Sequence, residues 1–210
     1  MDRYERIRDL IPQSFEKLQN TKVLLLGVGG VGGVCLECLY RSGVKDITIV
    51  DCDTFDITNQ NRQLGSEALG EYKVAYHAKT KGVKAINAKI DAKWVQDFDF
   101  NSYDFVLDAI DDMSAKVAIA HKCAPKLISA TGSARKFDPT KNEVASIWKT
   151  TVDPLAKKFR YELKKSGFEG DFLTVYSTEN ADTNIGSFMG VTGAFGLTLC
   201  SLVVQKVKES

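Results

Sequence analysis

The stretch VLLLGVGGVGGVCLECLYRSGVKDITIVDCD, residues 23 to 53, decides the fold that this sequence predicts. An apolar run over residues 23–26 leads into a glycine turn, and a helical pattern of apolar residues follows. A second apolar run over residues 47–50 ends on Asp51, nineteen residues after Gly32. This spacing predicts a nucleotide-binding unit, because glycines let backbone approach phosphate, a helix start offers free amides, and an acidic residue meets a ribose hydroxyl. The alternative is a glycine turn that only packs a helix on a strand. The glycines concerned are Gly27, Gly29, Gly30 and Gly32.

Length and composition narrow the class of protein. A chain of 210 residues suits a single domain over 1–210. Lysine and arginine (28) nearly balance aspartate and glutamate (27), so binding to nucleic acid would require a local basic patch. Five scattered cysteines favour a reducing, cytoplasmic location, and the charged N-terminus has no apolar leader segment. The apolar residues 188–204 are interrupted by glycines, so we expect a buried helix and no membrane partner.

Alternating strand and helix patterns over residues 21–134 predict an α/β fold. We expect a doubly wound, Rossmann-like, mainly parallel sheet with helices on both faces, extended by C-terminal strands and helices over 135–210. Residues 1–20 form a helical lead-in to this nucleotide-binding core, helical from residue 2 to 20. Further strands are expected at 85–90, 103–107, 126–130, 144–148 and 173–176. Helices are expected from Ser66 (as a cap) and over 72–84, 114–123, 154–165 and 188–204.

Polar side chains gather where the predicted strands end, the edge at which open parallel sheets bind ligands. In the loop after the second strand, Asn59 offers hydrogen bonds and Arg62 could hold phosphate oxygens in a bidentate fork. Lys73 begins the next helix, and Asp111 with Asp112 could hold a divalent cation. Each also has a structural interpretation: a turn former, a solvated charge, an exposed lysine or an N-cap. Together they predict cleavage of a nucleoside triphosphate between its α and β phosphates, because charge develops on the leaving pyrophosphate.

These motifs resemble the ubiquitin-activating-like adenylyltransferases. The matching segments are GVGGVG (27–32), DCD (51–53, with Asp51 and Asp53), TNQNRQ (58–63), Lys73 and DAIDD (108–112). The resemblance implies ATP and Mg²⁺ as cofactors, with Gly30 at the phosphate turn, Asp51 at the ribose and Asp111 at the magnesium ion. It also implies phosphate contacts from Asn59, Arg62 and Lys73. In the family's homodimers an arginine near the N-terminus reaches the partner's ATP, and Arg6 is the matching residue here.

The second half resembles one branch of that family, the tRNA threonylcarbamoyladenosine dehydratases. The segments concerned are residues 152–167, 175–179 and 186–197. This resemblance implies ATP-dependent cyclisation of a threonylcarbamoylated adenosine beside the anticodon of tRNA, through an adenylated carboxylate with release of pyrophosphate and then AMP. The basic segment with Lys157, Lys158, Arg160, Lys164 and Lys165, interleaved with Phe159 and Tyr161, could contact RNA. The alternative is a solvated amphipathic helix with Phe159 and Leu163 facing inward.

Two features of the sequence differ from the family pattern, and three other functions fit part of it. Enzymes that activate sulfur-carrier proteins hold zinc with two CxxC pairs, whereas this chain has only Cys35 and Cys38, so no structural zinc is expected. Residues 183–187, TNIGS, lack the cysteine that precedes the closing helix in the dehydratases, and Cys200 is expected to be buried, so thioester chemistry is not expected. The first rival function is adenylation of the C-terminal glycine of a ubiquitin-like sulfur-carrier protein, for which a sulfur-transfer protein is a further partner. The second is a nicotinamide oxidoreductase, and the third is a nonenzymatic binding module. The oxidoreductase leaves Arg62, Lys73 and Asp111 without a role.

Overall fold

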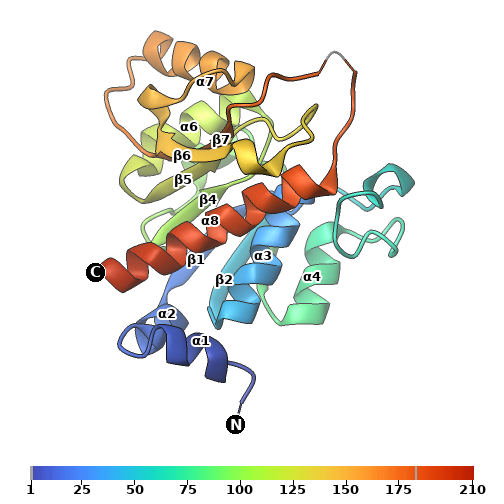
Figure 1. Ribbon diagram of the computed structural model, residues 1–210, viewed down its shortest axis with the longest axis vertical. Helices are drawn as coiled ribbons and strands as arrows, with labels where there is room; N and C mark the ends of the chain where they lie inside the picture. The colour runs from blue at the N-terminus through green and yellow to red at the C-terminus, as the bar shows by residue number, and fades with distance from the viewer. Residues whose placement is uncertain (1, 183) are drawn as a thin grey trace.

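A seven-stranded sheet forms the centre of the computed structural model, which describes residues 2–182 and 184–210 (Figure 1). Thr183 of the TNIGS segment therefore lies outside the described residues. The strand order is β3-β2-β1-β4-β5-β7-β6, and every pairing is parallel except that of β6 with β7. The predicted mainly parallel, Rossmann-like α/β fold is confirmed. The strands are β1 (Lys22–Leu26), β2 (Asp46–Asp51), β3 (Lys84–Asn87), β4 (Phe105–Asp108), β5 (Leu127–Ala130), β6 (Asn142–Ser146) and β7 (Leu173–Ser177).

Helices cover both faces of this sheet, as β1 shows residue by residue. Because successive side chains of a strand point to opposite faces, Val23 and Leu25 enter one core while Leu24 and Leu26 enter the other. Helices α2, α3 and α8 contribute to the first core, and α5, α6 and α7 to the second. The helices are α1 (Glu5–Leu10), α2 (Phe15–Asn20), α3 (Gly30–Ser42), α4 (Lys73–Lys81), α5 (Ala92–Asp97), α6 (Met113–Cys123), α7 (Pro154–Lys165) and α8 (Met189–Glu209).

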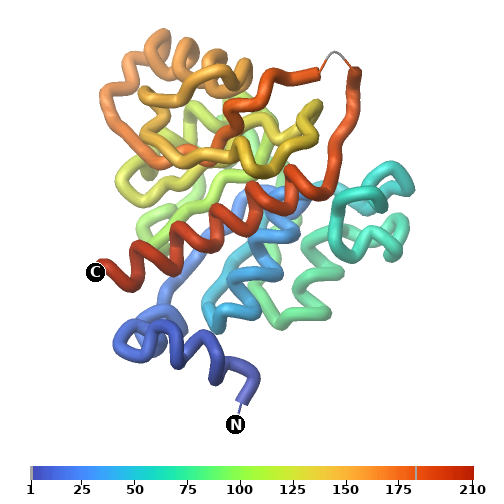
Figure 2. Tube along the Cα trace, viewed as in Figure 1, coloured from blue at the N-terminus to red at the C-terminus, as the bar shows by residue number. Residues whose placement is uncertain are grey.

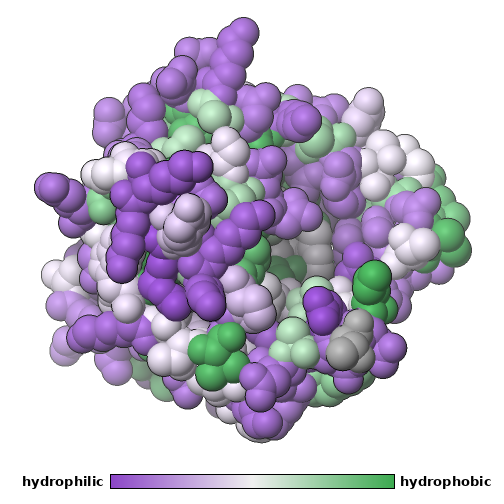
Figure 3. Space-filling view, turned by 90° about the horizontal axis from the view of Figure 1, so that it is seen from above, coloured by the Kyte–Doolittle hydropathy of each residue, from purple (hydrophilic) through white to green (hydrophobic). Residues whose placement is uncertain are grey.

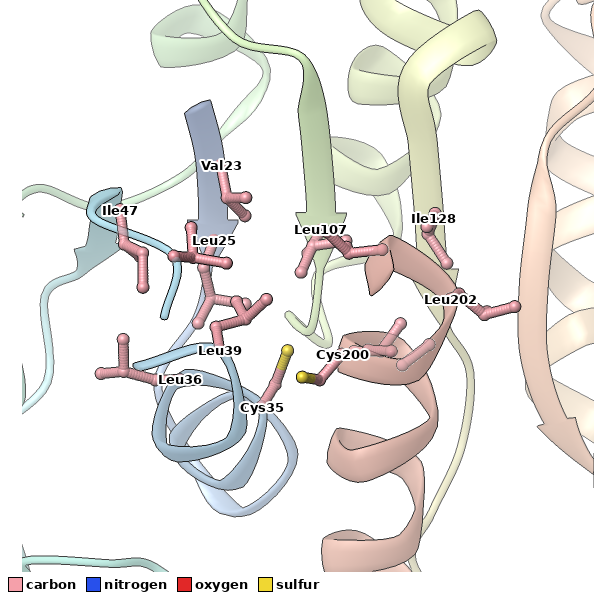
Figure 4. Close-up of a cluster of buried hydrophobic side chains, with 14 of the residues drawn as sticks. Val23, Leu25, Cys35, Leu36, Leu39, Ile47, Leu107, Ile128, Cys200 and Leu202 are labelled. Atoms are coloured by element: carbon pink, nitrogen blue, oxygen red, sulfur yellow. The ribbon is translucent and has the colours of Figure 1, made fainter. Parts of the chain in front are cut away.

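The long closing helix α8 packs against α3 across the first core. Figure 4 shows Cys35 and Leu39 of α3 beside Cys200 of α8, and both cysteines are buried, as expected for Cys200. The two helices approach closely at Gly196, where a Cβ atom would lie 2.4 Å from the carbonyl oxygen of Val31. By length and composition α8 is the one helix of the described chain that could cross a membrane. Ten of its residues are buried in the protein, so one face of the helix packs in the core, as predicted for a buried helix.

The N-terminal lead-in differs from the single helix predicted over residues 2–20. It forms two short helices, α1 and α2, because the residue before a proline is disfavoured in helical conformation. Ile11, which precedes Pro12, has φ −134° and ψ 54°. Phe15 and Leu18 of α2 are buried in the first core. Figure 2 shows this lead-in at the end of the molecule where β1 begins, so it covers the amino ends of the strands.

The local structure differs from the sequence prediction in three further places: one expected helix is absent, one helix ends earlier, and one helix was not predicted. The short helix expected from Ser66 is absent, because the buried Ser66 hydroxyl instead donates to the Gln63 carbonyl within a series of turns. Helix α4 ends at Lys81 rather than residue 84, since Gly82 adopts a left-handed conformation (φ 70°) that terminates helices. Helix α5 was not predicted, although Asp91 caps it by accepting a hydrogen bond from the Trp94 amide.

Candidate active site

A cavity of about 640 Å³ opens at the carboxyl ends of the central strands. The chain passes from β1 to β2 and β3 on one side and then to β4 and β5 on the other, so this is the point where the strand order reverses. Seen from above, the surface is hollowed near its middle, with hydrophilic side chains around the hollow (Figure 3). The cavity brings together nearly all the predicted binding residues: Gly27, Gly29, Gly30, Asp51, Asp53, Asn59, Arg62, Lys73, Asp111 and Asp112.

The glycine turn forms the floor of this cavity. Gly29 is the N-cap of α3, so the first amide groups of that helix face the cavity without intrahelical acceptors. The turn is tight enough to require glycine at Gly32, where a Cβ atom would lie 1.9 Å from the carbonyl oxygen of Gly27. Gly32 itself is buried in α3 and is not part of the lining, so its role is to let the turn close.

Asp51 ties the glycine turn to the end of β2. One carboxylate oxygen accepts a hydrogen bond from the Val28 amide and the other from the Asp53 amide, both at 2.8 Å. A carboxylate has about four lone-pair sites, so Asp51 can still accept hydrogen bonds from a ligand. Sequence reasoning assigned Asp51 only a ligand contact, and the structure adds this role in shaping the turn.

Lys73 is buried, contrary to the exposed position that a lysine at a helix start usually takes. It is the first residue of α4 and only 5% exposed, and its ammonium lies 3.0 Å from Asp53 Oδ2. Among the described residues, Asp53 is the one acceptor of a hydrogen bond from this ammonium. Two of the three N–H groups are therefore free to donate to a ligand. A buried cation with open donors on a cavity wall is suited to bind an anion.

Arg62 and Asn59 are held by their own loop, which contains a short 3-10 turn at Ile57–Asn59. The Asn59 side-chain oxygen accepts a hydrogen bond from the Asp56 amide and so closes a capping box. Arg62 donates from Nη1 to the Thr58 carbonyl at 2.9 Å and to Asn61 Oδ1 at 2.8 Å. Its Nε and Nη2 have no acceptor in residues 2–182 or 184–210, so this edge of the guanidinium can still bind a ligand.

The two aspartates after β4 have different roles. Asp112 caps α6 by accepting a hydrogen bond from the Ala115 amide at 2.7 Å, which is the structural interpretation of this residue. Asp111 is exposed on the cavity wall. Within the described chain no three His, Cys, Asp or Glu side chains are grouped to hold a metal ion. Mg²⁺ commonly takes only one or two carboxylates and completes its shell with phosphate and water, so Asp111 still fits that chemistry.

Arg6 is the one predicted catalytic residue that the structure separates from the cavity. It is exposed on α1, at the end of the sheet where the strands begin, and it is not among the cavity residues. Within its own subunit Arg6 therefore cannot contact a ligand in this cavity.

Two buried ion pairs behind the cavity were not identified from the sequence. Lys116 of α6 donates to Asp108 Oδ2 at 2.8 Å and to the Ala130 carbonyl at 2.7 Å, with both charged side chains fully buried. Lys136 donates to Asp153 Oδ2 at 2.5 Å and to the Gly132 carbonyl at 2.7 Å. Both lysines therefore hold backbone oxygens of residues 130–134, which form one wall of the cavity.

Cys52 also lines the cavity, and sequence reasoning did not single it out. Burial and the neighbouring carboxylates of Asp53 and Asp51 raise the pKa of this thiol. A raised pKa keeps the thiol protonated at neutral pH and makes Cys52 a poor nucleophile.

Known proteins are similar to this chain in sequence and in architecture. The sequence matches the ThiF family over residues 2–179. It is 38% identical over 181 residues to the tRNA threonylcarbamoyladenosine dehydratase of Bacillus subtilis, covering 80% of this chain and 71% of that protein. It is 32% identical over 232 residues to the dehydratase of the same name from Haemophilus influenzae, covering 93% and 89%. The solved structure of Escherichia coli tRNA N6-threonylcarbamoyladenosine dehydratase, TcdA, in complex with ATP superposes with a TM-score of 0.91 at 28% identity, covering 98% of this chain and 93% of that one.

Proposed function

The chain belongs to the ThiF family, and we propose that it catalyses the ATP-dependent cyclisation, formally a dehydration, of N6-threonylcarbamoyladenosine in tRNA. Two relatives with at least 32% identity are named for this activity, and a neighbour of nearly the same architecture holds ATP. The cavity at the carboxyl edge of the sheet is the proposed site of the reaction.

The observation that carries this proposal is the buried Lys73 ammonium beside the glycine turn. With two open N–H donors, and with the free edge of Arg62 on the same cavity, it offers positive charge to a polyphosphate. The amides at the start of α3 add further donors for phosphate oxygens. A volume of about 640 Å³ lies within the range of small-molecule sites, so the cavity can hold a nucleotide and part of a second substrate.

In the proposed reaction the threonyl carboxylate of the nucleoside attacks the α phosphate of ATP. The bond from that phosphorus to the bridging oxygen breaks, and pyrophosphate leaves with the added negative charge. Lys73 and Arg62 would stabilise that charge, because preorganised donors act most strongly where charge develops. The carbamoyl group of the same nucleoside then attacks the acyl carbon, loses a proton and expels AMP. Proximity within one substrate replaces a protein nucleophile, so the raised pKa of the Cys52 thiol does not hinder this route.

Asp111 is the residue that we propose for Mg²⁺. When bound, the ion would neutralise phosphate charge, and Asp111 would supply one carboxylate ligand from an exposed position on the cavity wall. Asp112 has one oxygen committed to the α6 cap, so we assign it to holding the loop in place.

Pyrophosphate release tests this function. The purified protein is incubated with ATP and no tRNA, with tRNA that carries the threonylcarbamoyl group, or with tRNA that lacks it. We expect stimulation by the modified tRNA alone and a loss on the order of 100-fold in Arg62→Ala, the cost of one transition-state donor. Arg41→Ala is the matched control, because Arg41 is exposed and pairs with Glu37 away from the cavity. If neither tRNA stimulates release, the proposal is refuted, and stimulation by a ubiquitin-like carrier protein would favour the alternative adenylation.

We also propose that the protein forms a homodimer in which Arg6 reaches the partner's cavity. Mixing Arg6→Ala with Arg62→Ala tests this arrangement. In a mixed dimer, the subunit that retains Arg62 would receive an intact Arg6 from its partner, so random exchange would restore about one quarter of the wild-type activity. If Arg6 does not reach the partner's cavity, mixing restores nothing beyond the sum of the separate variants, and the proposed arrangement is refuted.

A further inference from the structure

Helix α7 exposes a row of basic side chains on its outer side. Residues 157, 158, 161, 164 and 165 are exposed, whereas Ala156 is buried and Phe159 and Leu163 belong to the second core. This spacing places the exposed side chains along one face of the helix. Phe159 is therefore a core residue and cannot stack on a base, so for Phe159 and Leu163 the alternative interpretation, with both side chains facing inward, is confirmed. The exposed set, here called the basic stripe, comprises Lys157, Lys158, Tyr161, Lys164 and Lys165.

The charge of the basic stripe is not neutralised by the protein. Throughout residues 2–182 and 184–210, no carboxylate forms an ion pair with any of its four lysines. Arg160 does not belong to the stripe, because it is half-buried and donates a hydrogen bond to Thr150 Oγ1. Tyr161 lies among the lysines with 63% of its surface exposed. The stripe is thus a local positive surface on a chain whose net charge is only +1.

The basic stripe lies on the helix whose first turn lines the cavity. Leu155 of the same helix lines the cavity, and residues 157 to 165 extend about 12 Å away from it at 1.5 Å per residue. The buried Lys136–Asp153 pair fixes the position of the start of α7 relative to the cavity wall. Asp153 caps α7 by accepting from the Ala156 amide at 2.8 Å, while Lys136 holds the Gly132 carbonyl of the cavity wall. The helix and the cavity wall are therefore attached to one buried ion pair.

We propose that the basic stripe binds the sugar–phosphate backbone of the tRNA, with Tyr161 stacking on an unpaired base. This inference rests on the proposed function, which supplies an RNA that must place one nucleoside in the cavity. Lysine ammonium groups without carboxylate partners suit phosphate, and an exposed aromatic ring within such a row suits single-stranded RNA. The direction of the stripe, outward from the cavity, suits a polymer that enters the site with one residue and continues across the surface.

The test compares two variants with the same change in net charge. In the first, Lys157, Lys158, Lys164 and Lys165 become glutamine; in the second, the exposed Lys45, Lys79, Lys206 and Lys208 become glutamine. The dissociation constant of unmodified tRNA is measured by filter binding at several salt concentrations. We expect the first variant to bind at least about tenfold more weakly than the wild type. Its slope of log Kd against log salt should fall by about 3, because each of the four lost phosphate contacts contributes about 0.7 to 0.9 to that slope. The second variant should bind like the wild type.

Tyr161→Ala provides an independent arm. It should weaken tRNA binding by about fivefold or more while leaving the salt slope unchanged, because stacking releases no counterions. Equal binding by the two lysine variants would overturn the proposal. The outcome is separate from the proposed chemistry, since backbone contacts do not require the modified nucleoside. In a further outcome, the first variant loses binding while modified tRNA fails to stimulate pyrophosphate release by the wild type. That result would refute the proposed reaction but support the RNA-binding surface.

Discussion

Replacing Lys136 by methionine should destabilise the protein far more than replacing an exposed lysine. The Lys136 side chain is 1% exposed and the Asp153 side chain 0%, so the substitution leaves a carboxylate buried without its cation. Breaking a buried pair in this way typically costs about 3 to 5 kcal/mol. With a urea m-value of about 2 kcal/mol/M, the unfolding midpoint should fall by roughly 2 M. Equilibrium urea unfolding followed by circular dichroism measures this change.

Two further variants separate the ion pair from other effects of the substitution. Lys136→Met combined with Asp153→Asn removes the buried charge but keeps a side chain that can cap α7, so it should recover about 2 kcal/mol relative to Lys136→Met alone. Lys84→Met is the control, because its pair with Asp46 is exposed and should contribute less than about 1 kcal/mol. The reasoning is refuted if Lys136→Met costs less than about 1 kcal/mol, or if the double variant is no more stable than the single one.

Three other perturbations test the remaining buried or strained residues. His77 is fully buried with no hydrogen-bond partner in the described chain, and burial lowers its pKa to about 4. The unfolded state takes up a proton near pH 6.5 and the folded state does not, so stability should fall by about 3 kcal/mol as pH drops from 6.5 to 4. In urea titrations, the His77→Phe variant should not lose this stability as the pH drops. The His121→Phe variant, which replaces the exposed histidine, should lose stability as the wild type does. The Lys116→Met substitution should lower the free energy of unfolding by about 3 to 5 kcal/mol in the same assay. The double variant, Lys116→Met with Asp108→Leu, should lose clearly less. Val152→Gly should stabilise the chain by about 1 kcal/mol and raise its melting temperature, because valine adopts φ 60° there with 52% exposure; an unchanged or lower melting temperature would contradict this.

The parts of the fold that depend on local patterns could be predicted from the sequence. Apolar runs that end in glycine or aspartate identified the central strands, and their carboxyl ends then grouped the polar loops at one edge. These patterns placed Arg62, Lys73 and Asp111 at one edge of the sheet, and all three line one cavity. It did not locate Arg6, because nothing local to α1 indicates whether that helix faces its own cavity or another subunit.

The buried ion pairs could not be predicted from residue spacing, although one signal was present for Lys116. Lys116 falls on the same face of α6 as Ile119, Ala120 and Cys123, so a helical projection places a charge among core residues. Such a position requires a partner, but only the fold brings Asp108 from β4 to it. Lys136 has no helical pattern around it, and its pairing with Asp153 depends on how the loops after β5 and before α7 meet.

The placement of the two buried pairs argues for a role beyond stability. A buried ion pair is often no more stabilising than well-packed apolar side chains of similar volume, so stability alone gives little reason for two of them under one cavity wall. Each lysine also donates to a backbone carbonyl of that wall, Lys116 to Ala130 and Lys136 to Gly132. Apolar side chains could fill the same volume but could not hold these carbonyls in place. A wall fixed in this way keeps the start of α7 at a constant position beside the cavity, which is the condition for a bound RNA to present its reacting nucleoside in the same place each time.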